Sequence, residues 1–138
     1  MERNIILPND VQDVPRLAAF IDEVCESVEL DMTTTMQINL AIEEAVVNVM
    51  NYAYPPGTYG EVDVKAKTYD TYVEFVISDK GTPFDPTLKE EADTTLSAED
   101  RKIGGLGIYL VRHIMDHVSY ERTDGCNVLI LRKDLKQK

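Results

Sequence analysis

The sequence has few cysteines, no long apolar run and a shortage of basic residues. Its two cysteines, Cys25 and Cys126, form no CxxC motif. They are too few for a zinc site or a disulfide framework, and they favour a reducing compartment. No apolar run approaches the ~20 residues that a membrane span needs. The N-terminus has charge, a very short apolar stretch and then Pro8, which is not typical of a signal peptide. We therefore expect a cytoplasmic protein.

Basic residues are outnumbered by acidic ones. Lys and Arg total 14 and Asp and Glu total 25, so the formal net charge is −11. This charge repels nucleic-acid phosphates and anionic lipids, which argues against direct nucleic-acid or membrane binding. A local positive pocket for a small anion stays open. The 138 residues, 43% hydrophobic and 28% charged, predict one soluble globular domain spanning residues 1–138.

Apolar spacing and turn residues predict the order strand, helix, helix, two strands, loop, helix and two strands. The predicted ranges are 4–7, 11–28, 31–54, 62–68, 72–78, a loop at 79–104, a helix after the glycines at 104–107, and strands at 118–122 and 127–132. We expect Asn9 or Asp10 to cap the first helix and Asp31 or a following threonine to cap the second. The order predicts an α+β fold. The expected architecture is a two-layer α/β sandwich, with a mixed, mostly antiparallel sheet and helices on one face.

The second predicted helix carries polar residues on an otherwise largely apolar surface. Gln37, Ala41, Glu44, Asn48 and Asn51 recur at steps of three and four and share one face. Burying Glu44 and Asn48 costs free energy unless a partner satisfies them. Two interpretations remain open. The pair bonds to a neighbouring loop or water, or it faces a ligand, with the Asn48 oxygen on Mg²⁺ and Glu44 accepting a proton from water or a hydroxyl.

The segment at residues 79–85, DKGTPFD, directly follows a predicted strand. The carboxylate of Asp79 is suited to accept a hydrogen bond from an exocyclic amine. Gly81 allows the backbone to approach a flat ring closely. Because Asp and Gly are common in turns after strands, a simple turn is the alternative interpretation.

Three glycines stand between the long predicted loop and the helix that follows it. Gly104, Gly105 and Gly107, with Leu106, allow backbone amides at a helix N-terminus to point at a phosphate. No Gly-Lys-Ser/Thr follows, so the segment is not a P-loop, and a glycine hinge without a ligand is equally open. Arg101 and the adjacent lysine are placed either to meet phosphate charge or to face solvent.

In their order and in the elements that carry them, these motifs resemble the GHKL (Bergerat-fold) ATPases. Within that superfamily they resemble the bacterial anti-sigma-factor serine/threonine kinases. Residues 44–48 (EAVVN) resemble the N box, residues 79–85 the first glycine box, and residues 104–108 (GGLGI) the second. The similarity spans nearly the whole chain and includes the final strand entry at residues 125–128 (GCNV).

The resemblance implies ATP bound against the sheet, adenine read by Asp79, Mg²⁺ held by Asn48, and Glu44 as general base toward a serine or threonine hydroxyl. We prefer Glu44 to Glu43 because Glu44 shares a helix face with Asn48. An ATP lid is expected at about residues 85–103. Asn127 stands where the family often has a threonine near the phosphates. The implied nucleotide-binding residues are Asn48, Asn51, Asp79, Gly81, Arg101, Gly104, Gly105, Leu106, Gly107 and Asn127.

The resemblance also implies a function. The expected activity is ATP-dependent phosphorylation of a small anti-sigma-factor antagonist by a protein that also binds a sigma factor, with a homodimer expected. A partner-switching module without useful kinase activity is the alternative, and an ATPase with another acceptor is a third. No phospho-accepting histidine domain accompanies the sequence, which argues against a full sensor histidine kinase. His113 and His117, four residues apart, suggest either a metal pair or an ordinary surface pair.

Overall fold

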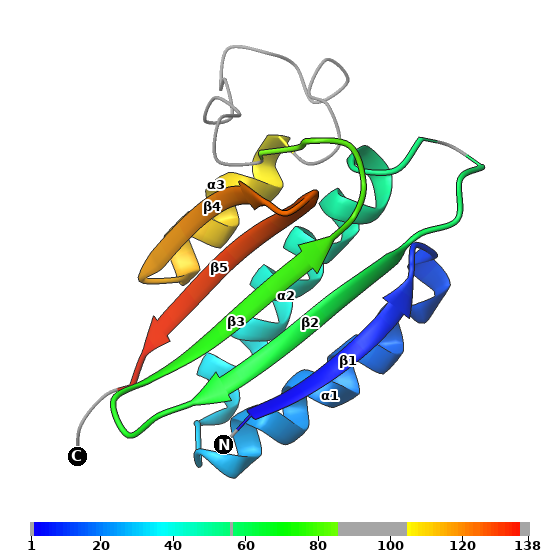
Figure 1. Cartoon of the computed structure of the whole chain (residues 1–138). Coiled ribbons are helices and arrows are strands. Elements are labelled where there is room, and N and C mark those ends of the chain that lie inside the picture. The colour runs from blue at the N-terminus through cyan, green and yellow to red at the C-terminus, as the bar shows by residue number, and fades with distance from the viewer. Residues whose placement is uncertain (1, 56, 86–104, 136–138) are drawn as a thin grey trace.

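The computed structural model describes residues 2–55, 57–85 and 105–135. These residues form a fold of two layers. A sheet of five strands forms one layer, and three helices cover one of its faces (Figure 1). In chain order the elements are β1 (Glu2–Pro8), a 3₁₀ turn (Val11–Asp13), α1 (Val14–Ser27), α2 (Met32–Tyr52), β2 (Glu61–Thr68), β3 (Tyr72–Asp79), α3 (Gly105–Ile114), β4 (His117–Thr123) and β5 (Cys126–Asp134). The predicted two-layer α+β sandwich is confirmed.

The strands lie in the order β1-β2-β3-β5-β4. All four strand pairs in the described part are antiparallel, so the sheet is more uniform than the mixed sheet that we expected. The β4–β5 hairpin turns at Asp124 and Gly125, whose φ angles are 52° and 77°. Two successive positive φ angles suit a tight hairpin between right-twisted strands.

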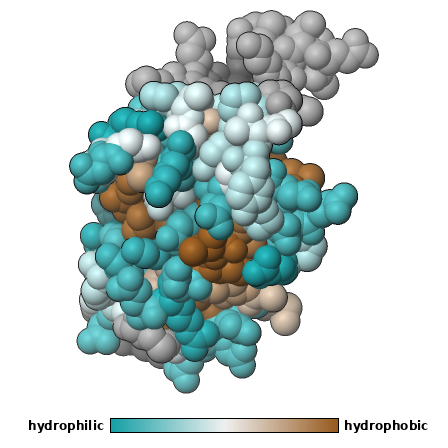
Figure 2. Space-filling model, turned by 45° about the vertical axis from the view of Figure 1, so that its right-hand side comes forward, coloured by the Kyte–Doolittle hydropathy of each residue, from teal (hydrophilic) through white to brown (hydrophobic). Residues whose placement is uncertain are grey.

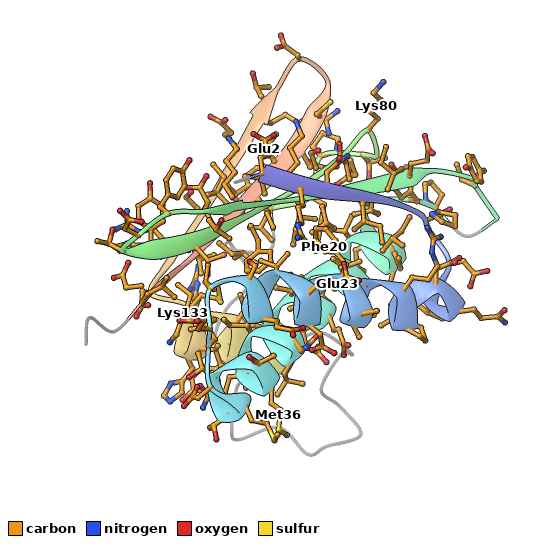
Figure 3. The ribbon with its side chains drawn as sticks, turned by 90° about the horizontal axis from the view of Figure 1, so that it is seen from below. Glu2, Phe20, Glu23, Met36, Lys80 and Lys133 are labelled. Atoms are coloured by element: carbon orange, nitrogen blue, oxygen red, sulfur yellow. The ribbon has the colours of Figure 1, made fainter. Side chains whose placement is uncertain are left out.

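The core lies between the sheet and the helices because each strand alternates in burial. In β3, Val73, Phe75 and Ile77 are buried and face the helices. Phe20 of α1 fills the space under the sheet, and Met36 projects from the side of α2 that faces away from it (Figure 3). This alternation also sends Asp79, the last residue of β3, toward the helix layer.

One of the two predicted helix caps is confirmed, and the other caps a different element. The Asp31 carboxylate accepts a hydrogen bond from the Thr34 amide at 3.0 Å, and it caps α2 as expected. Asp10 instead caps the 3₁₀ turn through the Gln12 amide, at 2.9 Å, and α1 proper begins only at Val14. None of the helices within the described ranges is long and apolar enough to cross a membrane.

The cap on α2 has a measurable consequence for stability. Replacing Asp31 by alanine leaves an amide of the first helical turn without its side-chain acceptor. We expect the free energy of unfolding to fall by about 1 kcal/mol. Urea denaturation followed by circular dichroism measures it, with Asp31→Asn as the control that keeps an acceptor oxygen. Equal losses in the two variants would contradict the capping role.

Candidate functional site

The candidate site lies at one end of the sheet. There α2 and β3 end, β5 begins and α3 begins (Figure 1). The predicted residues Glu44, Asn48, Asp79 and Asn127 belong to these elements, and Gly81 lies in the loop directly after β3. Segments far apart in the sequence therefore meet at this end of the molecule.

The α2 helix contributes Glu44 and Asn48. Asn48 is only 4% exposed, although its side chain is polar. Glu44, one turn earlier, is half-buried. A buried amide on an otherwise apolar helix needs a partner, and its oxygen is a ligand type that Mg²⁺ accepts. Asn51, one turn later, is exposed.

Glu43, beside Glu44 on the same helix, has a different environment. Burial raises the pKa of the Glu43 carboxyl, and the charges of Glu44 and Asp22 raise it further. Since Asp22 belongs to α1, Glu43 lies on the side of α2 toward α1. Adjacent helical residues point about 100° apart, so Glu43 and Glu44 lie on different sides of α2.

Asp79 provides a buried carboxylate at the end of β3, with 4% of its surface exposed. Its Oδ1 accepts hydrogen bonds from the Gly81 amide at 2.8 Å and from the Asn127 side-chain amide at 2.9 Å. Its Oδ2 is buried and has no hydrogen-bond partner within the described ranges. Burial raises the pKa of Asp79, while the bonds from Asn127 and Gly81 and the charge of Arg122 lower it in part. One oxygen is thus held and the other is left to accept a donor.

Asn127 lies directly opposite Asp79 in the β3–β5 pairing, and it is 3% exposed. Its Nδ2 group donates to Asp79 Oδ1 at 2.9 Å and to the Thr82 carbonyl at 2.8 Å. Its Oδ1 accepts from the Tyr120 hydroxyl at 2.5 Å and from the Phe84 amide at 3.1 Å. A carboxamide has two N–H donors and two acceptor lone pairs, so these four bonds occupy all of them.

The loop after β3 is anchored on the end of α2. Both the amide and the hydroxyl of Thr82 donate to the Ala53 carbonyl, at 2.7 and 3.0 Å. A Cβ on Gly81 would lie 2.3 Å from the same carbonyl oxygen, so only glycine fits this close approach. We expected Gly81 to permit approach to a ligand ring, and its close contact with the C-cap of α2 is a second reason for glycine at this position.

The second glycine motif lies only partly within the described residues. Gly105, Leu106 and Gly107 form the first turn of α3, whereas we expected the helix to begin after these glycines. Amides of a first turn have no intrahelical partner, so this turn can still donate to an anion. Gly104, Arg101 and the lid expected at about residues 85–103, apart from Asp85, lie outside the described residues.

The two histidines do not form a helical pair. The α3 helix ends at Ile114, so His113 is on the helix and His117 is the first residue of β4. His117 lies 3.8 Å from an Asp134 carboxylate oxygen, and His113 stacks on Tyr109. Within the described ranges no group of three or more His, Cys, Asp or Glu side chains is arranged to hold a metal. The i, i+4 metal pair is therefore wrong for this fold.

Sequence reasoning missed the residues that build the network around Asp79. Tyr120 and Thr82 bond to Asn127, and Arg122 donates to the Gly81 carbonyl at 2.9 Å. These contacts depend on strand register, which places Asp79, Asn127 and Arg122 in one row across β3, β5 and β4. No local motif indicates them.

A pocket of about 710 Å³ adjoins this end of the sheet. Asp79 and Gly81 line it, but so do Ile6, Asp63 and Ser78, which point away from the helices. Glu44 and Asn48 are not among its lining residues. The pocket therefore borders the Asp79 end of the candidate site from the open face of the sheet.

The two-layer fold and the polar groups gathered at one end of its sheet define an ATPase-type α+β domain. The family model described as a histidine kinase-like ATPase domain matches residues 7–133, so the chain belongs to that family. This match agrees with the resemblance to the GHKL ATPases that the three sequence motifs carry.

Curated relatives add a narrower similarity. The chain is 33% identical over 94 residues to the serine/threonine-protein kinase BtrW of Bordetella bronchiseptica, covering 68% of this chain and 66% of that protein. It is also 33% identical over 99 residues to the serine-protein kinase RsbW of Listeria monocytogenes serovar 1/2a, covering 69% and 63%. The matched region thus spans slightly less than two thirds of these relatives' length.

Solved structures share the fold. The crystal structure of the RsbU and RsbW domains of a Mycobacterium tuberculosis protein aligns with a TM-score of 0.71 and 16% identity, covering all of this chain and 33% of that one. The mycobacterial sensor histidine kinase MprB aligns with a TM-score of 0.55 and 16% identity, covering 94% and 97%. At these identities the likeness concerns the fold alone.

Proposed function

We propose that the chain is an ATP-dependent serine/threonine protein kinase that phosphorylates a small anti-sigma-factor antagonist and also acts as an anti-sigma factor. The observation that carries the proposal is a buried carboxylate at the end of β3, Asp79, with one oxygen that has no partner in the described part of the chain. It lies in a histidine kinase-like ATPase fold whose α2 helix carries the buried amide of Asn48. The serine-kinase names of relatives at 33% identity support the choice of acceptor.

The residues present fit an adenine nucleotide. A buried carboxylate oxygen without a donor costs free energy, and Asp79 Oδ2 is such an atom. An exocyclic amine supplies the missing N–H. In this proposal Asp79 binds the 6-amino group of adenine. The first-turn amides of α3, from Gly105 to Gly107, are proposed to donate to the phosphates. Gly104 and Arg101 are proposed as further phosphate contacts on the family resemblance alone.

The residues also fit a hard divalent cation. Asn48 offers a buried amide oxygen, and Mg²⁺ prefers oxygen ligands shared between protein, water and phosphate. Bound with ATP, Mg²⁺ would neutralise charge on the transferring phosphoryl group. Asn48 would hold it, with Asn51 near the same end of α2.

Glu44 is proposed as the general base. It lies one helical turn before Asn48 and is half-buried. A carboxylate at this position would accept the proton of the attacking serine or threonine hydroxyl. Phosphoryl transfer depends mostly on positioning and charge stabilisation, so this residue's role is to orient the hydroxyl and remove its proton.

Partners and location complete the proposal. The protein is proposed to be cytoplasmic and to form a homodimer that binds both the antagonist and a sigma factor. Apolar patches interrupt the mostly hydrophilic surface on the face shown in Figure 2. Among the described residues, the apolar side chains of Met32, Met36 and Tyr59 are 80%, 66% and 74% exposed. Exposed apolar side chains of this kind supply contact area for protein partners.

A phosphotransfer assay tests the proposal. The purified protein is incubated with ATP, Mg²⁺ and an antagonist protein from the same organism, and phosphorylated residues are identified by mass spectrometry. We expect phosphoserine or phosphothreonine on the antagonist, and no transfer when Mg²⁺ is removed with a chelator. ATP binding without antagonist phosphorylation would favour the partner-switching module instead, and ATP turnover without antagonist would favour another acceptor.

A further inference from the structure

The hydrogen bonds around Asp79 are asymmetric, and Asn127 causes much of the asymmetry. Asp79 Oδ1 receives two donors, from Gly81 and Asn127, whereas the buried Oδ2 receives none in the described part of the chain. A carboxylate could present either oxygen to a ligand. In this site only one is left to do so.

We propose that Asn127 is a positioning residue that sets the base selectivity of this site. It holds Asp79 by Oδ1 so that Oδ2 alone meets the 6-amino group of an adenine nucleotide. The inference rests on the proposed nucleotide function. It assigns Asn127 an indirect role, in place of the direct contact with the nucleotide that the family resemblance implies.

The orientation of the Asn127 amide is determined by partners that cannot change roles. The Phe84 amide is only a donor, and the Thr82 carbonyl is only an acceptor. Rotating the carboxamide by 180° would place its NH₂ group against the Phe84 N–H and its oxygen against the Thr82 carbonyl. The Tyr120 hydroxyl adds a further bond to the observed arrangement. The donor that faces Asp79 is therefore fixed.

The same bonds argue against direct contact between Asn127 and a nucleotide. All four hydrogen-bonding positions of the amide are used within the protein, and the residue is 3% exposed. Asn127 therefore acts on a ligand through Asp79. A site built to accept an N–H strongly disfavours an analogue that presents an oxygen there, because two acceptors then face each other.

A matched pair of variants tests this role. Threonine and valine have nearly the same shape, but only threonine has a hydroxyl that can donate to Asp79 Oδ1. Calorimetry with Mg²⁺ measures the dissociation constants of ADP and of inosine diphosphate (IDP), whose base has an oxygen in place of the 6-amino group. We expect Asn127→Thr to keep most of the preference for ADP over IDP and Asn127→Val to lose at least about tenfold of it.

The ratio of the ADP affinity to the IDP affinity distinguishes a positioning role of Asn127 from a purely structural one. A purely structural role would weaken ADP and IDP binding equally and leave the ratio unchanged in the valine variant, which would overturn the proposal. Equal ratios in the threonine and valine variants would overturn it as well. If either variant does not fold, as judged by thermal unfolding, the smaller pair Asn127→Ser and Asn127→Ala decides by the same comparison.

Nucleotide binding by the unmodified protein distinguishes a failure of the proposed nucleotide function from a failure of the role proposed for Asn127. If it binds neither ADP nor IDP, the proposed nucleotide function fails, and this inference fails with it. If it prefers ADP and Asn127→Val keeps that preference, only the role of Asn127 fails, and the nucleotide site stands.

Discussion

Replacing Asp79 by asparagine is expected to weaken ADP binding by at least about tenfold and to raise the affinity for IDP relative to ADP. The Gly81 and Asn127 amides both donate to Oδ1, so the new carbonyl oxygen takes that position. The new NH₂ group then stands where Oδ2 was, and it opposes the 6-amino group of adenine. Calorimetry with both nucleotides measures the two affinities.

Asp63→Asn is the matched control for this substitution. Asp63 also has a buried oxygen without a partner in the described part of the chain, but it points to the open face of the sheet, beside Ser78. We expect its replacement to leave ADP binding largely unchanged. If Asp79→Asn also left ADP affinity unchanged, the assignment of Asp79 to the base would be wrong.

The stability of the Asp79→Asn variant serves as a second control. Burial raises the pKa of Asp79 in the folded protein above its usual value. The contribution of Asp79 to the free energy of unfolding is therefore fully present at pH values below the usual pKa of an aspartate. It is lost as the pH rises through the raised pKa, because the folded protein then has to ionise a buried carboxyl. At neutral pH the substitution removes this charge, so we expect no loss in the thermal unfolding midpoint. Lost ADP binding then reports on the site rather than on the fold.

Replacing Glu44 by alanine is expected to lower antagonist phosphorylation by about 10²–10⁴-fold and to leave ADP binding largely intact. This loss of phosphotransfer is the size expected when a general base is removed. ADP binding should be unaffected because Glu44 is proposed to act on the hydroxyl rather than on the nucleotide. Single-turnover transfer of labelled phosphate measures the first quantity, and calorimetry measures the second.

Glu43→Ala is the control on the same helix. Glu43 faces α1, where the charge of Asp22 contributes to its raised pKa, and it is expected to keep phosphotransfer. Loss of transfer in the Glu43 variant alone would assign the base to the other carboxylate. Loss of ADP binding together with transfer in Glu44→Ala would show a structural role for Glu44.

The sequence predicted the elements of this fold because their signals are local. Burial alternates along β2 and β3 as expected, and Asp31 caps α2 as expected. The α2 helix ends at Tyr52 rather than at about Tyr54. Tyr54 precedes Pro55, whose ring disfavours helical backbone in the residue before it, and the Tyr54 hydroxyl donates to the Glu61 carbonyl at 2.7 Å.

The candidate site was predicted in its motifs but not in its connections. Glu44 and Asn48 share a helix face, and helical periodicity alone indicates that. The bond from Asn127 to Asp79 spans 48 positions and depends on the register of β3 against β5. The histidine pair failed for a related reason, since the end of α3 at Ile114 separates two residues that a longer helix would have aligned.

The pair of hydrogen bonds from Thr82 to the Ala53 carbonyl has a consequence for the thermodynamics of ligand binding. It joins the C-cap of α2 to the segment that follows Asp79, so the elements that carry Asn48 and Asp79 are linked before any ligand arrives. Little conformational entropy is then lost at these two positions when a nucleotide binds. The free energy of nucleotide binding at Asn48 and Asp79 should consequently depend mainly on the contacts that each residue makes with the ligand. Only a small entropic cost should arise from bringing α2 and the segment after β3 together.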